Sequence, residues 1–286
     1  MNLGDRLAAD LRFARVGAHT VLTRRRHRWP VVIGRVFDDH SGRGALTLQN
    51  AAGTVIPGDV IRARIDVVDG AWATVMGQGA TLVSGVPDGD VSVEETRLFV
   101  DAGSHLRFDP SPRILTTHAR HRQRTEVCVE PGGCAVVVDA IVLHPELAGG
   151  DTAFGSLESM VTVRAPDGVL LALDTQLLDD PPATERFTAF GTVYLVGTGF
   201  DTALTAATPE LESLTAMSGR TVYVGISDLP NEAGWAVRIA AADGGVLRNA
   251  VSAITARLDS LAPFRRNAVS ARSEHEVGVK RSRTGY

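Results

Sequence analysis

The stretch that decides the fold runs from Val60 to Val68 and reads VIRARIDVV. Residues 61, 63, 65 and 67 are apolar, whereas residues 62, 64 and 66 are charged. Because successive side chains of a β-strand point to opposite faces, this period of two is typical of a half-buried strand. The segment therefore predicts a strand with one face in a core and the other toward solvent.

Similar segments recur on both sides of this stretch. Turn signals such as Pro57-Gly58-Asp59 and Pro166-Asp167-Gly168 separate them. Recurrent strands with Gly- and Asp-rich turns indicate an all-β fold, a β-helix-like sandwich of many short strands with about two helices. The other predicted strands are Val31–Ile33, Ala71–Val75, Leu98–Val100, Cys134–Leu143, Met160–Val163, Val169–Leu173, Val193–Val196, Thr221–Ile226 and Ala236–Ala240.

Two segments have helical features. Thr208-Pro209 places a capping hydroxyl before a first-turn proline, which predicts a helix over Glu210–Met217. Val246–Leu261 has apolar residues at spacings of three and four, and Pro263 follows as a stop.

The domain organisation follows from where these signals end. Asp180-Pro181-Pro182-Ala183 is interpreted as a loop inside one β architecture, because strand signals resume at Phe187. Residues 1–263 are therefore predicted to form a single β domain. Residues 264–286 are polar and cationic, which predicts a flexible tail.

Composition limits the possible function. The 286 residues are 44% hydrophobic and 22% charged, which is ordinary for a globular protein. A net charge of −4 offers no general attraction to nucleic acid or anionic lipid. No apolar run approaches the ~18 residues of a membrane span, and Met1 to Arg15 lacks the apolar segment of a signal peptide. We expect a cytoplasmic protein that binds neither nucleic acid nor membrane.

Lysine is almost absent, since Lys280 is the only one. A Schiff-base lysine in the core, or the lysine of a phosphate-binding loop, is therefore excluded outside the last seven residues. No G-x-S-x-G, H-E-x-x-H or strand-linked G-x-G-x-x-G motif occurs either. These absences favour a protein that is not an enzyme.

The two cysteines, Cys128 and Cys134, flank the turn Pro131-Gly132-Gly133, which could bring their sulfurs together. Two free thiols are the favoured interpretation, and a disulfide or a two-sulfur metal site is the alternative.

Two basic segments contain histidines. His118 and His121 have a helical ligand spacing, but they lie in an arginine-rich strand or loop, which favours a solvated polar segment over metal ligation. The run 24–28 (RRRHR) favours a solvated strand edge or a protein-docking patch over RNA binding, because aromatic residues are not interleaved with it.

Carboxylates inside apolar runs are the strongest candidates for chemistry. Asp139 interrupts the run 136–143, and Asp174 ends the run 169–173. A carboxylate in a buried strand needs a partner, a water or a cation, because desolvating it alone is expensive. A structurally paired aspartate is the favoured reading, and a polar lining for hydrated divalent ions is the functional alternative.

In order along residues 15–200, the chain resembles the UreD/UreH family of urease accessory proteins. Seven segments carry the resemblance: the opening strands at 17–22 and 28–33, the turn at 50–59, the strand pair at 70–81, the segment 99–110 and the strands at 139–143 and 170–178. The turn NAAGTVIPGD is similar to the family's P-x-G-G-x-x-x-G-D, and GAWATVMGQGAT to its G-A-x-A-x-x-T-x-x-A-T.

The resemblance implies a scaffold that binds apo-urease together with UreF and the GTPase UreG, and that assists the delivery of nickel. It also implies no tightly bound cofactor, transient nickel as cargo and a homodimeric arrangement within the complex. Asp59, Asp139 and Asp174 are then the candidates for a nickel pathway, with Asp151 a weaker fourth.

Two alternatives stay open. One is an interaction module without a metal role. The other is a carbohydrate-active hydrolase that uses paired carboxylates, although aromatic residues make up only 5% of the chain, which is few for stacking on sugars.

Overall fold

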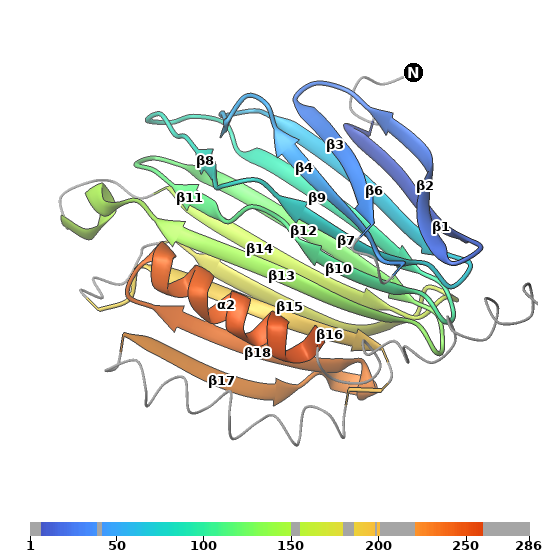
Figure 1. The fold of residues 1–286 in the computed structure, drawn as a ribbon. Coiled ribbons are helices and arrows are strands. Elements are labelled where there is room, and N and C mark those ends of the chain that lie inside the picture. Colours follow the sequence, from blue (N-terminus) through green and yellow to red (C-terminus); the bar gives the residue numbers. More distant parts are fainter. Residues whose placement is uncertain are drawn as a thin grey trace, which may run out of the picture.

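In a computed structural model, the described residues form two β-sheets stacked face to face, with one α-helix on the outer face of one sheet (Figure 1). The structure describes residues 7–38, 42–149, 155–179, 186–197, 199–200 and 221–259. Among these residues no helix is long and apolar enough to cross a membrane.

Seven strands make up the first sheet, called sheet A. In spatial order they are β15 (Leu170–Leu178), β14 (Ser156–Arg164), β12 (Arg120–Val129), β9 (Ser92–Val100), β6 (Val60–Val68), β1 (Ala9–Val16) and β2 (His19–His27).

The second sheet, sheet B, has eleven strands. Its main path is β17 (Val222–Asp228), β18 (Gly234–Ala241), β16 (Ala189–Gly197), β13 (Cys134–Leu143), β10 (His105–Asp109), β7 (Trp72–Gly77), β4 (Gly44–Asn50) and β3 (Val31–Asp38). The short strands β5 (Thr54–Val55), β8 (Thr81–Val83) and β11 (Arg113–Leu115) extend it. Two 3₁₀ helices, η2 (Pro145–Gly149) and η3 (Pro230–Glu232), lie between strands.

The chain winds between the two sheets like a coil. Strands β6, β9, β12 and β14 are parallel neighbours in sheet A, and β4, β7, β10 and β13 are parallel neighbours in sheet B. Antiparallel pairs such as β1–β2 and β14–β15 close the edges. The predicted all-β, β-helix-like sandwich is confirmed.

The predicted alternation in VIRARIDVV is realised in β6, whose bounds match the prediction. Ile61, Ile65 and Val67 are buried between the sheets, while Arg62 and Arg64 lie on the outer face. Strand β13 differs because both of its faces are covered, one by sheet A and one by a helix. Its nearly continuous apolar sequence is typical of such a strand.

That helix is α2 (Gly244–Asp259), which packs on β16, β17 and β18. Asp243 caps its first turn, with Oδ1 accepting a hydrogen bond from the Val246 amide at 2.8 Å. Leu247 and Ile254 are buried against the outer face of sheet B. The predicted helix at 246–261 is confirmed, with both ends shifted by about one turn or less. The helix expected at 210–217, the loop at 180–183 and the tail at 264–286 lie outside the described residues.

Two features of the strands were not anticipated. Cys128 and Cys134 are free thiols on opposite sides of the sandwich, because the turn between them joins the two sheets instead of closing a hairpin. The suggestion that their sulfurs could meet is therefore wrong. Strand β1 was also missed, although its alternating Leu11 and Phe13 are fully buried.

Candidate functional site

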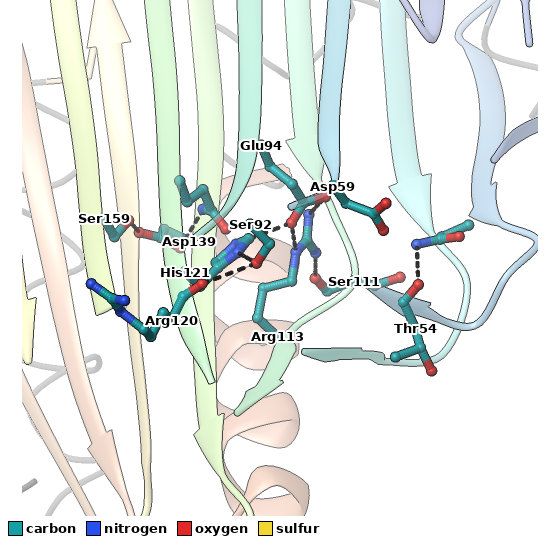
Figure 2. A network of polar contacts seen from close by, with 12 residues as sticks. Thr54, Asp59, Ser92, Glu94, Ser111, Arg113, Arg120, His121, Asp139 and Ser159 are labelled. Atoms are coloured by element: carbon teal, nitrogen blue, oxygen red, sulfur yellow. Dashed lines mark hydrogen bonds and ion pairs between the residues drawn. The ribbon is translucent and has the colours of Figure 1, made fainter. Parts of the chain in front are cut away.

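A row of polar side chains crosses the interior between the sheets. Four of them lie in register on the inner face of sheet A, and two face them from sheet B. The four are Glu94 (β9), Gln123 (β12), Ser159 (β14) and Gln176 (β15), and the two are Asp139 (β13) and Thr192 (β16). These six residues, together with His121 on β12, are called the polar row below, and Figure 2 shows the part from Ser159 to Glu94.

Asp139 is at the centre of the row, and its side chain is 4% exposed. Its Oδ1 accepts a hydrogen bond from Gln123 Nε2 at 2.8 Å, and its Oδ2 accepts one from Ser159 Oγ at 2.5 Å (Figure 2). No cation forms an ion pair with it among the described residues. Burial therefore raises the pKa of Asp139, although the two hydrogen bonds oppose this effect.

Glu94 lies at one end of the row, in contact with Arg113 from β11. Arg113 Nη2 donates to Glu94 Oε1 at 2.9 Å, and its Nε also donates to the same carboxylate. Burial alone raises the pKa of Glu94, but the charge and hydrogen bonds of Arg113, together with the adjacent His121, outweigh burial and hold the pKa at about 2. Glu94 is therefore an ionised carboxylate inside the protein.

His121 lies between Glu94 and Asp139 and is 1% exposed. Its Nδ1 is 2.9 Å from Ser92 Oγ. Its Nε2 is 3.3 Å from Glu94 Oε2 but has no hydrogen-bond partner of good geometry in the part of the chain that is described. A buried ring nitrogen in this state can still bind a water molecule or a metal ion. The expectation of a solvated segment is wrong for His121, because β12 turns it inward, whereas His118 lies outside β12 at a positive φ of 59°.

The other end of the row lies beside Asp174 on β15. Gln176 Nε2 donates to Thr192 Oγ1 at 3.3 Å. Asp174 Oδ2 accepts hydrogen bonds from Tyr194 Oη at 2.8 Å and Arg238 Nη1 at 2.9 Å. Burial raises the pKa of Tyr194, and the charges of Asp139 and Asp174 raise it further. Tyr194 is thus a neutral donor that both aspartates influence.

Cavities adjoin both ends of the row. A cavity of about 90 Å³ is lined by Glu94 and Arg113, and one of about 400 Å³ is lined by Gln176, Thr192 and Arg238. Either has room for ordered water, which needs roughly 10–15 Å³ per molecule. The row therefore lies between two sites that can hold water.

The wall of the smaller cavity coincides with a break in sheet B. Strand β7 ends at Gly77 and β10 at Asp109, before β8 and β11 begin. Met76, Gly77, Pro110 and Ser111 line both this cavity and a cavity of about 280 Å³ beside α2. This short section of sheet therefore borders both cavities.

The structure places the predicted aspartates in different surroundings. Asp139 and Asp174 both point into the sandwich, from facing sheets. Asp59 instead caps the turn before β6, where its Oδ2 accepts a hydrogen bond from the Ile56 amide at 3.0 Å. Its carbonyl accepts from the Val93 amide, so it adjoins the Glu94 end without belonging to the polar row. Asp151 lies outside the described residues.

Sequence reasoning missed Glu94, and it also missed that His121 belongs to the site. Glu94 has an acidic neighbour, Glu95, on the outer face, so neither carboxylate stood out. The period of two that placed VIRARIDVV, applied to Ser92–Val100, would have put Glu94 on the same face as Leu98 and Val100. No three His, Cys, Asp or Glu side chains among the described residues lie close enough together to hold a metal ion.

Fold and site define the chain as a β-helical sandwich that encloses a polar row between its sheets. The family described as UreD urease accessory protein matches residues 6–273. This match extends well beyond residues 15–200, where the resemblance was evident from motifs. The chain belongs to the UreD family of urease accessory proteins.

Individual relatives agree with the family match. Urease accessory protein UreD of Mycolicibacterium smegmatis is 67% identical over 258 residues, covering 90% of this chain and 92% of that protein. Urease accessory protein UreD 1 of Methylorubrum populi is 33% identical, covering 88% and 87%. Urease accessory protein UreD of Haloarcula marismortui is 33% identical, covering 67% of this chain and 64% of that protein.

Proposed function

We propose that this chain assists the maturation of urease without catalysing a reaction itself. In this role it acts as a scaffold that binds apo-urease together with UreF and the GTPase UreG, and nickel is cargo that passes through it. Membership in the UreD family supports the accessory role. The partners UreF and UreG come from the family resemblance.

The observation that carries the nickel part of the proposal is the polar row. Carboxylate oxygens and imidazole nitrogens are suitable ligands for divalent metal ions of this kind. Asp139 is a buried carboxylate without an ion-pair partner among the described residues, and His121 Nε2 has no well-aligned hydrogen-bond partner there. A passing cation would offset the cost of burying both groups.

The spacing of the groups suits transit. The charged and polar side chains follow one another from Glu94 through Asp139 to Gln176, with cavities at both ends. In this proposal Asp139 and Asp174 are pathway carboxylates, and Glu94 and His121 join them. The hydrogen bond of Asp59 to its own turn gives that residue a structural task, so we place it at the margin of the pathway.

The test is co-expression of urease with the other accessory proteins, with and without this chain, and measurement of nickel per urease active site. We expect nickel-poor, inactive urease when the chain is absent. Fully loaded urease without the chain would overturn the accessory role.

Variants then separate the pathway from the scaffold. Asp139→Asn and His121→Phe are expected to lower nickel loading while the complex with apo-urease still forms. Asp167→Asn is the matched control, because Asp167 lies in the exposed β14–β15 turn and bonds only the Val169 amide among the described residues. Normal loading by both row variants would contradict the route and leave the accessory role standing.

A further inference from the structure

The outer face of sheet A is a field of arginines and carboxylates in four rows that cross the strands. From the β2 side to the β15 side, the rows are Arg24–Arg12–Asp66–Phe99–Cys128–Arg164, Arg26–Asp10–Arg64–Arg97–Glu126–Thr162–Leu173, Arg62–Glu95–Arg124–Met160–Thr175 and Val93–Arg122–Glu158–Leu177. These residues are called the arginine face below. The edge position expected for the run 24–28 is confirmed, since most of it lies on the edge strand β2.

The arginine face has the opposite sign of charge to the rest of the molecule. It carries nine arginines and five carboxylates, a net charge of +4. The whole chain has a net charge of −4, so the remaining residues carry −8. Such an asymmetry is an electrostatic feature that steers and orients a charged partner.

The ion pairs in this face leave guanidinium donors available. Glu126 lies between Arg97 and Arg164, and Glu158 lies between Arg122 and Arg124. Each guanidinium has five N–H donors, of which these contacts use one or two. The Arg97 side chain is 76% exposed, so its remaining donors can reach an incoming carboxylate. Arg12 and Arg26 have no ion-pair partner in the described part of the chain.

No described element covers the arginine face, whereas α2 covers part of the outer face of sheet B (Figure 1). Two of these rows end on the edge strand β15 at Leu173 and Leu177, which are 52% and 64% exposed. Exposed leucines beside a field of arginines combine the apolar and guanidinium groups that are enriched in protein interfaces.

We propose that the arginine face is the surface on which this chain docks an acidic surface of the urease apoprotein. The proposal rests on the accessory role proposed above. Urease is the one partner that the names of the family and of its relatives specify. The chemistry of the face, cationic with an apolar border, calls for carboxylates with some apolar area on the partner.

Nucleic acid is the other polyanion that arginines bind, and the face suits it less well. Five carboxylates are interleaved with the arginines and would repel a phosphate backbone. Phe99 is the one aromatic residue in the four rows, which leaves no series of stacking platforms for bases. A mosaic of both charges can instead match a complementary mosaic on a protein.

The test is a binding titration of the full chain with nickel-free urease apoprotein at low and at high sodium chloride. The variants are Arg97→Glu and the pair Arg12→Glu with Arg97→Glu. Arg97 has only a long ion pair, 3.9 Å from its Nε to Glu126 Oε1, and Arg12 has none among the described residues. The matched control is Arg35→Glu with Arg248→Glu. It makes the same change in net charge at exposed positions of β3 and α2, away from the arginine face.

We expect wild-type binding that weakens with salt, a loss of at least about tenfold in the double variant, a smaller loss in Arg97→Glu, and no change in the control. Circular dichroism and thermal unfolding establish that the variants are folded. If the double variant does not fold, the binding of Arg97→Glu is the test, because the Arg97 side chain is mostly in solvent and its replacement should not affect folding. Undiminished binding by the folded variants would overturn the docking surface.

The outcomes distinguish this proposal from the proposed function. If wild type does not bind the apoprotein and urease loads without it, the accessory role fails. If wild type binds and supports loading but the variants bind equally well, the docking surface alone fails. A fluorescent RNA oligonucleotide serves as a second probe. Tight binding that the double variant loses, together with unchanged apoprotein binding, would assign the face to nucleic acid and overturn the proposal.

Discussion

Asp139 and Asp174 are both inward-facing carboxylates, yet their surroundings differ in a way that separates their roles. Asp174 has an arginine partner, Arg238, and a tyrosine donor. Asp139 has only the neutral donors of Gln123 and Ser159. A cationic partner offsets part of the cost of burying a carboxylate, whereas a carboxylate without such a partner carries more of that cost. A residue that costs stability and is nevertheless present is a good candidate for function.

Neutralising Asp139 should therefore not harm the fold. A pKa raised in the folded state means that the stability due to this group is present at low pH and is lost as pH rises through the folded-state pKa. Desolvation of the carboxylate disfavours the folded state, so we expect Asp139→Asn to unfold at the same or a higher temperature. Asp174→Asn should lose about 1 kcal/mol, because Arg238 is left unpaired and is partly exposed. Thermal unfolding of both variants checks this, and a marked loss in Asp139→Asn would contradict it.

His105 provides a pH-dependent contribution elsewhere in the molecule. Its Nδ1 is 2.7 Å from Cys134 Sγ, and its ring centroid is 3.9 Å from that of Trp72. Burial and the nearby charge of Arg43 lower the pKa of His105 from 6.5 to about 4. Between these values the unfolded chain binds a proton that the folded chain does not. The stability due to this group is thus present above pH 6.5 and is lost as pH falls toward 4.

Replacing His105 should make the unfolding free energy depend less on pH below pH 6.5. We expect the unfolding free energy of His105→Phe to fall by about 1–2 kcal/mol less than that of wild type between pH 6.5 and 4, an amount discounted for the partial exposure of the ring. Urea unfolding at several pH values measures both slopes. Parallel curves for the two proteins would show that His105 does not titrate in this way.

At the residue scale, the sequence predicted buried aspartates but could not predict their partners. Asp139 was recognisable because it interrupts an apolar run. Ser159 and Gln123, which bind it, come from two other strands, and only the winding of the chain brings these strands together. Side chains that meet through long-range pairing leave no local signal, so Glu94 and His121 were not assigned to the site.

At the scale of elements, success depended on how strictly a strand alternates. Both β6 and β13 were predicted with their observed bounds, because one alternates cleanly and the other is apolar throughout. For the segment around His121, now strand β12 (RHRQRTEVCV), the sequence predicts either a strand or an arginine-rich loop. Its inner face is partly polar, with His121 and Gln123 pointing inward, so hydrophobic periodicity could not identify it. The inward polar side chains of the polar row are thus the reason why hydrophobic periodicity did not identify β12.

Close approaches between successive coils depend on glycine. A Cβ added at Gly77, at the end of β7, would lie 2.0 Å from the Ser111 amide nitrogen. One at Gly225, in β17, would meet nothing closer than Tyr223 Cε1 at 4.0 Å. At Gly77, the backbones of two neighbouring coils therefore lie in direct contact, at the break in sheet B. Gly225 has no such contact.

Alanine at these two glycines should have opposite effects. Gly77→Ala must push residues 110–112 away, so we expect a loss of about 1–3 kcal/mol in unfolding free energy, as for other overpacked sites. Gly225→Ala should be neutral or slightly stabilising, because alanine loses less backbone entropy than glycine on folding. Urea unfolding of both variants is the measurement. Equal effects would mean that the coil contact at Gly77 relaxes without cost.

At the scale of the whole molecule, the outer faces of the two sheets differ. Sheet B is covered in part by α2 and contains the break next to the interior cavity. Sheet A presents the arginine face. In each strand of sheet A, alternate residues point toward the interior and toward solvent. The same strands therefore supply the polar row on the inner face and the arginine face on the outer one. Substitutions can therefore change the polar row or the arginine face separately.

The last prediction concerns the edge strand β15 in the isolated chain. No strand pairs with its free side in the described part of the structure, and Leu173 and Leu177 on it are exposed. An edge strand with no strand paired to its free side and with an exposed apolar stripe is a template for self-association. We expect Leu173→Lys with Leu177→Lys to reduce self-association, measured by light scattering at rising protein concentration. Val16→Lys with Ile56→Lys adds the same charge at exposed apolar positions away from this edge. An equal reduction in both pairs would assign the effect to net charge, and no reduction in the β15 pair would show that this edge is not the contact.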